Sequence, residues 1–198
     1  MKKFLTTLVL FILVSNCTAK PDPIRHGKIH PNTIKNNIKN DLNYFLLKHK
    51  QRWSKQNKKR FVEIVYKGQK EFGIKYKIVL SIISIESRYH IQAVGKNRKT
   101  TDYGLTQQNS KYMKKRYKRT EKYLKKNNLR YSRSKFDMCK NVFSCFMYLK
   151  TITKSKSIRN FKEVICAYNV GIRGVRLNKY QKPANRYYQK FIKEHMNI

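Results

Sequence analysis

The sequence predicts a mainly α-helical protein with a single domain, and three observations support this. Apolar residues recur at intervals of three and four along most of the chain, as in helices with one buried face. No segment shows sustained alternation of apolar and polar residues. Only seven Gly and four Pro occur in 198 residues, which favours long helices over a turn-rich β fold. This length suffices for one well-filled core with short extensions.

The N-terminus has the pattern of an export signal. Two Lys precede an eleven-residue apolar stretch at 4–14. This stretch is too short to cross a bilayer as a stable helix, so it indicates a signal peptide and not a membrane anchor. We expect the signal peptide to occupy residues 1–16 and the mature protein to lie in the periplasm or cell envelope.

The residues before Cys17 resemble a bacterial lipobox, in which the Cys becomes acylated. Asn16 is a departure, because Gly or Ala usually stands at that position. Ordinary cleavage after Ala19 is the alternative. We expect a lipid anchor on Cys17 that holds the protein at the membrane. Because Thr18 is not Asp, the outer membrane is the expected site in a Gram-negative host.

Two short regions precede the main domain. Residues 17–33 form a polar tether that contains Pro. Apolar residues at helical spacing then predict a first helix at 34–49, followed by a basic connector around Trp53. We assign residues 34–59 to an N-terminal helical extension and residues 60–198 to the main domain.

Six helices are expected in the main domain. Gly73 ends the first and Gly171 stops the fifth, because glycine commonly follows the last turn of a helix. A polar, irregular loop is expected at 88–111. The expected helices cover approximately 61–72, 75–87, 112–127, 137–149, 161–170 and 184–194.

The chain carries 47 Lys and Arg against ten Asp and Glu, a formal net charge of +37. Such a field concentrates polyanions at the surface. The basic residues occur in nearly every segment, which fits a solvated surface that faces anionic cell-envelope polymers or lipid headgroups. A general bias of the proteome towards Lys would give the same pattern. Specific nucleic-acid binding is supported by charge alone, because the sequence lacks zinc-finger spacing, RNP-type aromatic motifs and glycine-rich phosphate loops.

Three cysteines remain after Cys17. Cys139 and Cys145 are six residues apart on one expected helix, a rise of about 9 Å that a disulfide cannot bridge. In an exported protein, a bridge from one of them to Cys166 is the better geometric choice. Three buried free thiols are the alternative.

No metal and no organic cofactor is expected. The five His are scattered without metal-ligand spacing. They are His26, His30, His49, His90 and His195.

Glu86 is the most conspicuous acidic residue. It ends an apolar run at 78–85 and lies on one helical stripe with Val79 and Ile83, at positions i, i+4 and i+7. The carboxylate therefore continues a buried face, and burial raises the pKa of a carboxyl group toward neutrality. The alternative is a helix-terminal Glu in solvent.

Four motifs occur in order along the chain, and together they resemble the catalytic domain of soluble lytic transglycosylases. These belong to the lysozyme-like superfamily, which includes goose-type lysozyme, and act on peptidoglycan. The helix around Asp137 and the closing segment at 185–188 also resemble parts of this domain, so that the similarity covers roughly 60–192. The four motifs are at 72–74, 85–89, 102–109 and 167–171.

The resemblance implies a lysozyme-like fold and a role for each matching residue. Glu86 matches the family's single catalytic acid. Thr106 stands where the family usually has Met, so we expect an apolar contact to the sugar to be lost, and Cys145 stands where Gly is common. The residues that match substrate-binding positions are Ser87, Gln107, Tyr168, Asn169 and Tyr187.

The implied reaction needs only one carboxylate. Glu86 would protonate the glycosidic oxygen between N-acetylmuramic acid and N-acetylglucosamine, then take the proton of the C6 hydroxyl as a 1,6-anhydro ring closes. Ordinary glycosidases use two carboxylates. Asp102 is the nearest second candidate, and a loop-shaping role is favoured for it.

Two other functions share this fold. A goose-type lysozyme would hydrolyse the same bond with water, but it places an Asp where this chain has Asn109. A catalytically inactive, cationic wall-binding lipoprotein would keep the fold without the chemistry, and the presence of Glu86 argues against it.

Overall fold

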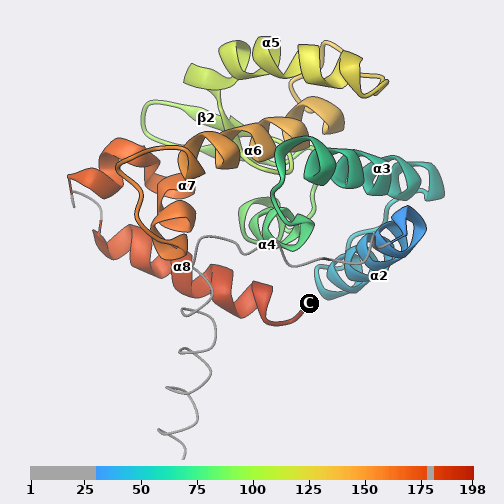
Figure 1. The fold of residues 1–198 in the computed structure, drawn as a ribbon, viewed down its shortest axis with the longest axis horizontal. Coiled ribbons are helices and arrows are strands. Elements are labelled where there is room, and N and C mark those ends of the chain that lie inside the picture. Colours follow the sequence, from blue (N-terminus) through green and yellow to red (C-terminus); the bar gives the residue numbers. More distant parts are fainter. Residues whose placement is uncertain (1–29, 178–180) are drawn as a thin grey trace, which may run out of the picture.

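Helices make up most of the computed structural model, which describes residues 30–177 and 181–198. Within these two ranges the fold has seven helices and a small sheet beside α5 (Figure 1). The helices are α2 (Pro31–Lys48), α3 (Lys55–Phe72), α4 (Tyr76–Ser87), α5 (Ser110–Lys126), α6 (Met138–Thr153), α7 (Phe161–Arg176) and α8 (Gln181–His195). The strands are β1 (Val94–Lys96), β2 (Thr101–Tyr103) and β3 (Gln108–Asn109). The prediction of a mainly α single domain is confirmed.

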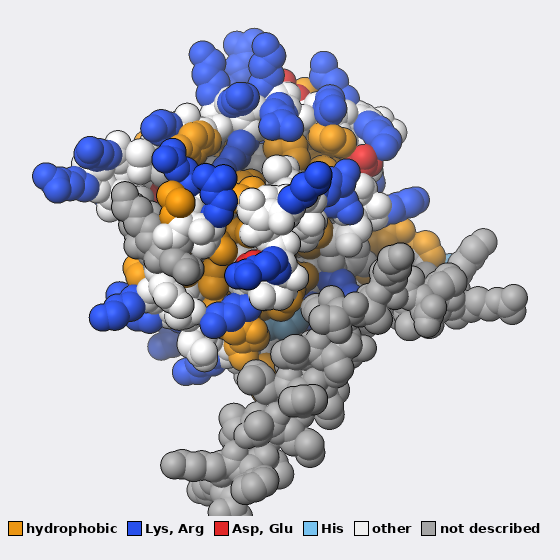
Figure 2. Space-filling model, turned by 60° about the vertical axis from the view of Figure 1, so that its left-hand side comes forward, with side chains coloured by type: hydrophobic (Ala, Val, Ile, Leu, Met, Phe, Trp, Pro, Cys, Tyr) orange, Lys and Arg blue, Asp and Glu red, His pale blue; other side chains and the backbone are white. Residues whose placement is uncertain are grey.

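Many Lys and Arg side chains lie on the surface of the fold. On the face drawn in Figure 2 they spread over most of the surface, with few Asp or Glu side chains between them. Most acidic side chains of the described ranges are neutralised, since six of them form ion pairs with Lys or Arg. The acids of these ranges without such an ion pair are Asp41, Glu86 and Asp102.

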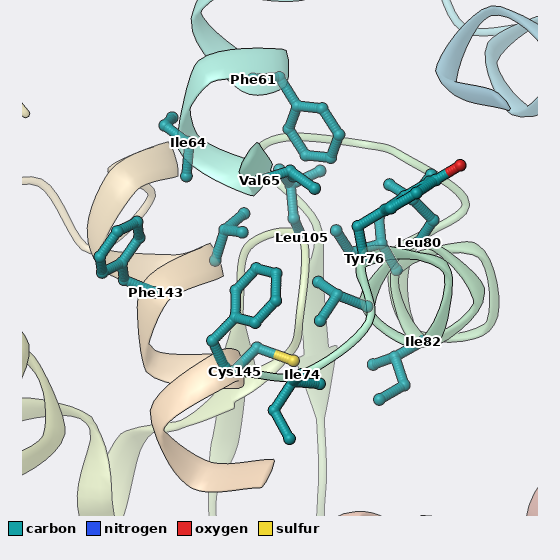
Figure 3. Packing of buried hydrophobic residues seen from close by; sticks show 14 of the residues in the cluster. Phe61, Ile64, Val65, Ile74, Tyr76, Leu80, Ile82, Leu105, Phe143 and Cys145 are labelled. Atoms are coloured by element: carbon teal, nitrogen blue, oxygen red, sulfur yellow. The ribbon is translucent and has the colours of Figure 1, made fainter. Parts of the chain in front are cut away.

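Helix α4 lies at the centre of the apolar core. Eight of its twelve residues are buried, and it contacts α2, α3, α6 and α8. Figure 1 shows it nearly end-on in the middle of the molecule. Figure 3 shows how side chains of α3, α4 and α6 meet in this core, among them Val65, Leu80 and Phe143. The helix that carries Glu86 is thus fixed on several sides by packing.

A close approach sets the packing of α3 on α6. Gly68 faces the ring of Phe146, and a Cβ atom added at Gly68 would lie 2.5 Å from Phe146 Cδ2. Only glycine leaves room for the ring here. Helix α3 ends at Phe72, and the next residue, Gly73, adopts a left-handed conformation with φ 67°. The expected end of this helix is confirmed.

Helix α2 packs on the same core as the rest of the domain. It begins at Pro31, so the last three residues of the expected tether are helical. His30 caps it by accepting a hydrogen bond from the amide of Asn32, and proline is well suited to the first turn. Helix α3 runs without interruption across the boundary that we expected at 59/60.

The segment at 88–111 contains more order than its sequence predicts. Its three short strands form an antiparallel sheet in the order β1-β2-β3, and Asp102 pairs with Gly95 on one side and with Asn109 on the other. The expectation of an irregular loop is therefore wrong. Strands of two or three residues are held by main-chain hydrogen bonds and are too short to show alternation.

Helix α7 does not stop at Gly171 as expected. It bends there, because Gly171 has φ 78° and ψ 158°, and a second helical stretch continues to Arg176. Glycine permits these angles without a steric penalty from a side chain. The bend turns the residues around Gly171 toward the cleft described below.

Cys139, Cys145 and Cys166 are free and buried. The thiol of Cys139 donates a hydrogen bond to the carbonyl of Arg130, and that of Cys166 to the carbonyl of Ala184. The expected disulfide is therefore wrong and the alternative of three buried thiols is correct. The three thiols are thus part of the buried interior of the domain.

Candidate active site

Glu86 lies in the last turn of α4 and reaches a cleft of ≈ 640 Å³. Helix α4 ends at the next residue, and Arg88 takes a left-handed conformation that turns the chain into the sheet. The side chain of Glu86 is partly buried and lines the cleft. The cleft is lined by Glu86, Asp102, Gln107, Asn109, Tyr112, Lys115, Arg116, Arg119, Met147, Tyr148, Thr151, Tyr168, Asn169, Val170, Gly171, Ile172 and Arg173.

Tyr187 of α8 contacts the carboxyl group of Glu86 directly. Its hydroxyl donates a hydrogen bond to Glu86 Oε1 at 2.6 Å. Tyr187 is buried, and its burial and the adjacent Glu86 raise its pKa well above the ordinary value, so the hydroxyl stays a donor. This bond fixes the orientation of the carboxyl group in the cleft.

Burial raises the pKa of Glu86 from 4.5 to about 7. The nearby negative charge of Asp102 adds to this effect, whereas the hydrogen bond from Tyr187 and the positive charge of Lys190 oppose it. A carboxyl group with such a pKa can both give and take a proton near neutral pH, as a general acid and base must.

Tyr168 and Asn169 form the wall supplied by α7. The hydroxyl of Tyr168 donates to the carbonyl of Thr106 at 2.9 Å, which ties α7 to the sheet region. The Tyr168 ring packs against that of Tyr148, with 5.8 Å between ring centroids. Asn169 is exposed in the cleft. Beneath this wall, burial raises the pKa of the Cys145 thiol to about 12, so it remains protonated.

Gln107 lines the cleft, but its amide group holds the loop. Its Nε2 donates to the carbonyl oxygens of Gly104 at 2.9 Å and Ala93 at 3.3 Å. Its backbone has φ 46°, a conformation that costs energy for a residue with a side chain. Its side-chain oxygen lies close to Gly95, where an added Cβ would be 2.5 Å away.

Of the residues that match substrate-binding positions, Ser87 and Tyr187 are absent from the cleft lining, and so is Thr106. The Ser87 hydroxyl donates to the carbonyl of Ile83 in its own helix. Thr106 is fully buried, and its hydroxyl contacts Asn141 of α6. The side chain of Thr106 thus supports the loop from behind and does not line the cleft, which is compatible with the expected loss of an apolar contact to the sugar.

Asp102 lies in the cleft as part of strand β2. Asn97 donates to its Oδ2 at 2.6 Å, and Asn109 donates to its Oδ1 at 2.7 Å. Both carboxylate oxygens therefore hold neighbouring parts of the sheet together. This agrees with the loop-shaping role that the sequence favours.

The sequence did not reveal the wall supplied by α5. Tyr112, Lys115, Arg116 and Arg119 all line the cleft, at spacings of three and four that place them on one face of α5. Arg116 stacks over the Tyr148 ring at 4.0 Å and donates to Gln108. The sequence shows this spacing, but basic residues occur on several faces of α5, so the sequence does not indicate which face lines the cleft.

A second cavity of ≈ 590 Å³ lies between α7 and α8. Its lining contains one acid, Glu163, which forms an ion pair of 2.8 Å with Arg159. Burial raises the pKa of Glu163, but the bonds from Arg159 outweigh this and hold the pKa below the usual value. Glu163 is therefore a structural acid and not a proton donor.

The described ranges contain no group of three or more His, Cys, Asp or Glu residues suited to hold a metal ion. Among the same residues, no helix is both long and apolar enough to cross a membrane.

A helical domain whose cleft is lined by a desolvated carboxyl group held by a tyrosine fits the class of lysozyme-like domains. The family described as Transglycosylase SLT domain matches residues 63–191, and the chain belongs to this family. Its fold is thus the lysozyme-like fold of lytic transglycosylase catalytic domains, as the sequence resemblance implied. Peptidoglycan is the substrate that this family implies. A comparison with curated proteins gave no match.

Proposed function

We propose that this domain is a peptidoglycan lytic transglycosylase in which Glu86 is the single general acid and base. It would cleave the β-1,4 bond between N-acetylmuramic acid and N-acetylglucosamine without water and leave 1,6-anhydro ends. The observation that carries this proposal is the contact between Tyr187 and Glu86, in a cleft where burial raises the pKa of Glu86 to about 7.

Glu86 would act twice in one turnover. Protonated, it gives its proton to the glycosidic oxygen as the bond breaks, and the acetamido group of the muramyl residue stabilises the positive charge at C1. As a carboxylate, it takes the proton of the C6 hydroxyl, whose oxygen attacks C1 and closes the anhydro ring. The bond from Tyr187 stabilises the carboxylate between the two steps.

The same cleft also supports a second candidate, hydrolysis. Asp102 lines the cleft with Glu86, and its charge acts on the pKa of Glu86. It could activate a water molecule, as the second carboxylate of a glycosidase does. Against this, both of its oxygens are occupied by Asn97 and Asn109.

Analysis of the products separates these functions. The exported domain is incubated with purified peptidoglycan, and the released fragments are analysed by mass spectrometry. Fragments one water lighter, with 1,6-anhydro ends, support the transglycosylase. Reducing ends would replace it with a hydrolase, for which Asp102 is the candidate second carboxylate. If neither the wild type nor Glu86→Gln releases fragments from peptidoglycan, the protein is a wall-binding protein without catalytic activity. For an active enzyme, we expect Glu86→Gln to lose at least about 100-fold in rate.

We also propose that the protein is exported and anchored to the outer membrane through an acylated Cys17. These features fall in residues 1–29, outside the described ranges. The apolar stretch at 4–14 and the lipobox-like residues before Cys17 support the proposal. Metabolic labelling with a fatty-acid analogue should mark the wild type and not Cys17→Ala. Labelling of neither would favour cleavage after Ala19.

A further inference from the structure

The wall of the cleft formed by α5 is strongly cationic. Lys115, Arg116 and Arg119 line it from one face of this helix, and Arg173 of α7 is also in the lining. The acids in the same lining are Glu86 and Asp102. Since the raised pKa of Glu86 keeps part of it neutral near pH 7, the cleft carries excess positive charge.

Three of these cations are available to a ligand. Lys115, Arg119 and Arg173 are exposed, and none of them forms an ion pair with any residue in 30–177 or 181–198. Arg116 differs, because its guanidinium group is held over Tyr148 and donates to Gln108. Arg116 therefore shapes the wall, and Lys115, Arg119 and Arg173 can meet charges on the substrate.

The cationic wall of α5 would add little to the binding affinity of an uncharged glycan. In peptidoglycan the sugars themselves are uncharged, and the carboxylates belong to the peptide stems on the C3 lactyl groups. Phosphodiester polymers, the other anionic substituent, attach through C6. That oxygen must be a free hydroxyl in the reacting muramyl residue, because it closes the anhydro ring. The reaction itself thus favours stem carboxylates as the partner of these cations.

We propose that Lys115, Arg119 and Arg173 bind the carboxylates of the peptide stems, so that the enzyme prefers stem-bearing strands to bare glycan. This inference rests on the proposed function and adds a specificity to it. Charge pairs at the rim of a site are weak singly and screened by salt. We therefore expect a preference of roughly tenfold in kcat/KM at low salt, which shrinks as salt is added.

The test compares two substrates and two double variants. The substrates are soluble glycan strands with intact stems and the same strands after an amidase has removed the stems. The test variant is Lys115→Gln with Arg119→Gln. The matched control is Lys114→Gln with Lys118→Gln, which removes the same charge from exposed positions of α5 outside the cleft lining. Release of 1,6-anhydro products is measured for each.

We expect the wild type and the control to prefer stem-bearing strands, and the test variant to have the same kcat/KM on both substrates. Equal rates on both substrates for the wild type, or equal loss of preference in the control, would overturn the proposal and leave the transglycosylase intact. Binding of each protein to a polyglycerol phosphate is measured as well. If the test variant loses this binding but still prefers stem-bearing strands, the cationic wall binds phosphodiester polymers instead, and the proposal is overturned. Absence of anhydro products from either substrate would reject the proposed function, and this specificity with it.

Discussion

The hydroxyl of Tyr187 lies 2.6 Å from Glu86 Oε1, although the two residues are 101 positions apart in the chain. One belongs to the last helix and the other to the central helix, which α8 packs against. The bond acts on Glu86 in two ways: it orients the carboxyl group, and it lowers a pKa that burial raises.

Replacing Tyr187 by Phe removes this bond and should raise the pKa of Glu86 further. The first step needs protonated Glu86, so kcat/KM of the wild type should fall as the pH rises through about 7. In Tyr187→Phe the midpoint of this fall should move to higher pH, while the maximal rate drops because the carboxylate has lost its donor. Rate profiles between pH 5 and 9 measure both effects. Tyr168→Phe is the control, since its hydroxyl bonds to Thr106 and the midpoint should stay in place.

Glu86→Gln should become more stable relative to the wild type as the pH rises. The pKa of Glu86 is raised in the folded state. Below pH 4.5 the side chain is neutral in both states and costs the fold nothing. As the pH rises through about 7, its ionisation increasingly destabilises the folded state relative to the unfolded state. Gln stays neutral and can still accept the bond from Tyr187. The gain in free energy of unfolding should approach at most about 3 kcal/mol at pH 8 and vanish near pH 4.

Urea unfolding at pH 4, 6 and 8 measures this gain. Glu121→Gln is the control, because Glu121 forms an ion pair with Lys140 and its pKa is lowered by that bond. The control should show no gain at high pH. Parallel stability curves for Glu86→Gln and the wild type would show that Glu86 is not desolvated in the folded protein.

Glu194 ties the last helix to the core, and its replacement by Gln should loosen α8. It accepts hydrogen bonds from Lys48 of α2 and from Ser84 of α4, and Ser84 in turn contacts His49. Burial raises the pKa of Glu194, but the bonds from Lys48 and Ser84 outweigh this and hold the pKa below its usual value. Glu194 therefore stabilises the fold above pH 4.5, and this stabilisation is lost as the pH falls through the lowered pKa.

Glu194→Gln should cost about 1–2 kcal/mol of unfolding free energy at pH 7. Glu63→Gln is the control, because its ion pairs with Lys35 and Lys67 are more exposed, with 34% of the Glu63 side chain accessible. That change should cost below about 1 kcal/mol. Equal losses in the two variants would contradict a special role for Glu194 in holding α8.

Gly68→Ala should destabilise the domain despite the higher helix propensity of alanine. The new Cβ would lie 2.5 Å from the buried ring of Phe146, so α3 and α6 would have to separate. Such overpacking costs about 1–3 kcal/mol. Thermal unfolding measures the loss, and Lys59→Ala on the exposed face of α3 should change stability by less than about 0.5 kcal/mol. A Gly68→Ala variant as stable as the wild type would mean that the two helices can move apart freely.

The sequence by itself determined the helices and the central acid. The spacing of apolar residues indicated the buried face of α4 and placed Glu86 on it, and the order of four motifs indicated the family. These features are local, since a helical period and a motif are written in neighbouring residues.

Only the tertiary structure decided what surrounds Glu86. The contact from Tyr187, the cationic wall of α5 and the support of the loop by Thr106 each join segments far apart in the chain. The sheet and the bend at Gly171 arise from backbone hydrogen bonds and backbone angles that side-chain patterns do not encode. The sequence thus identified the acid, and the packing of distant helices set its pKa and its partners, because desolvation and charge depend on the whole fold.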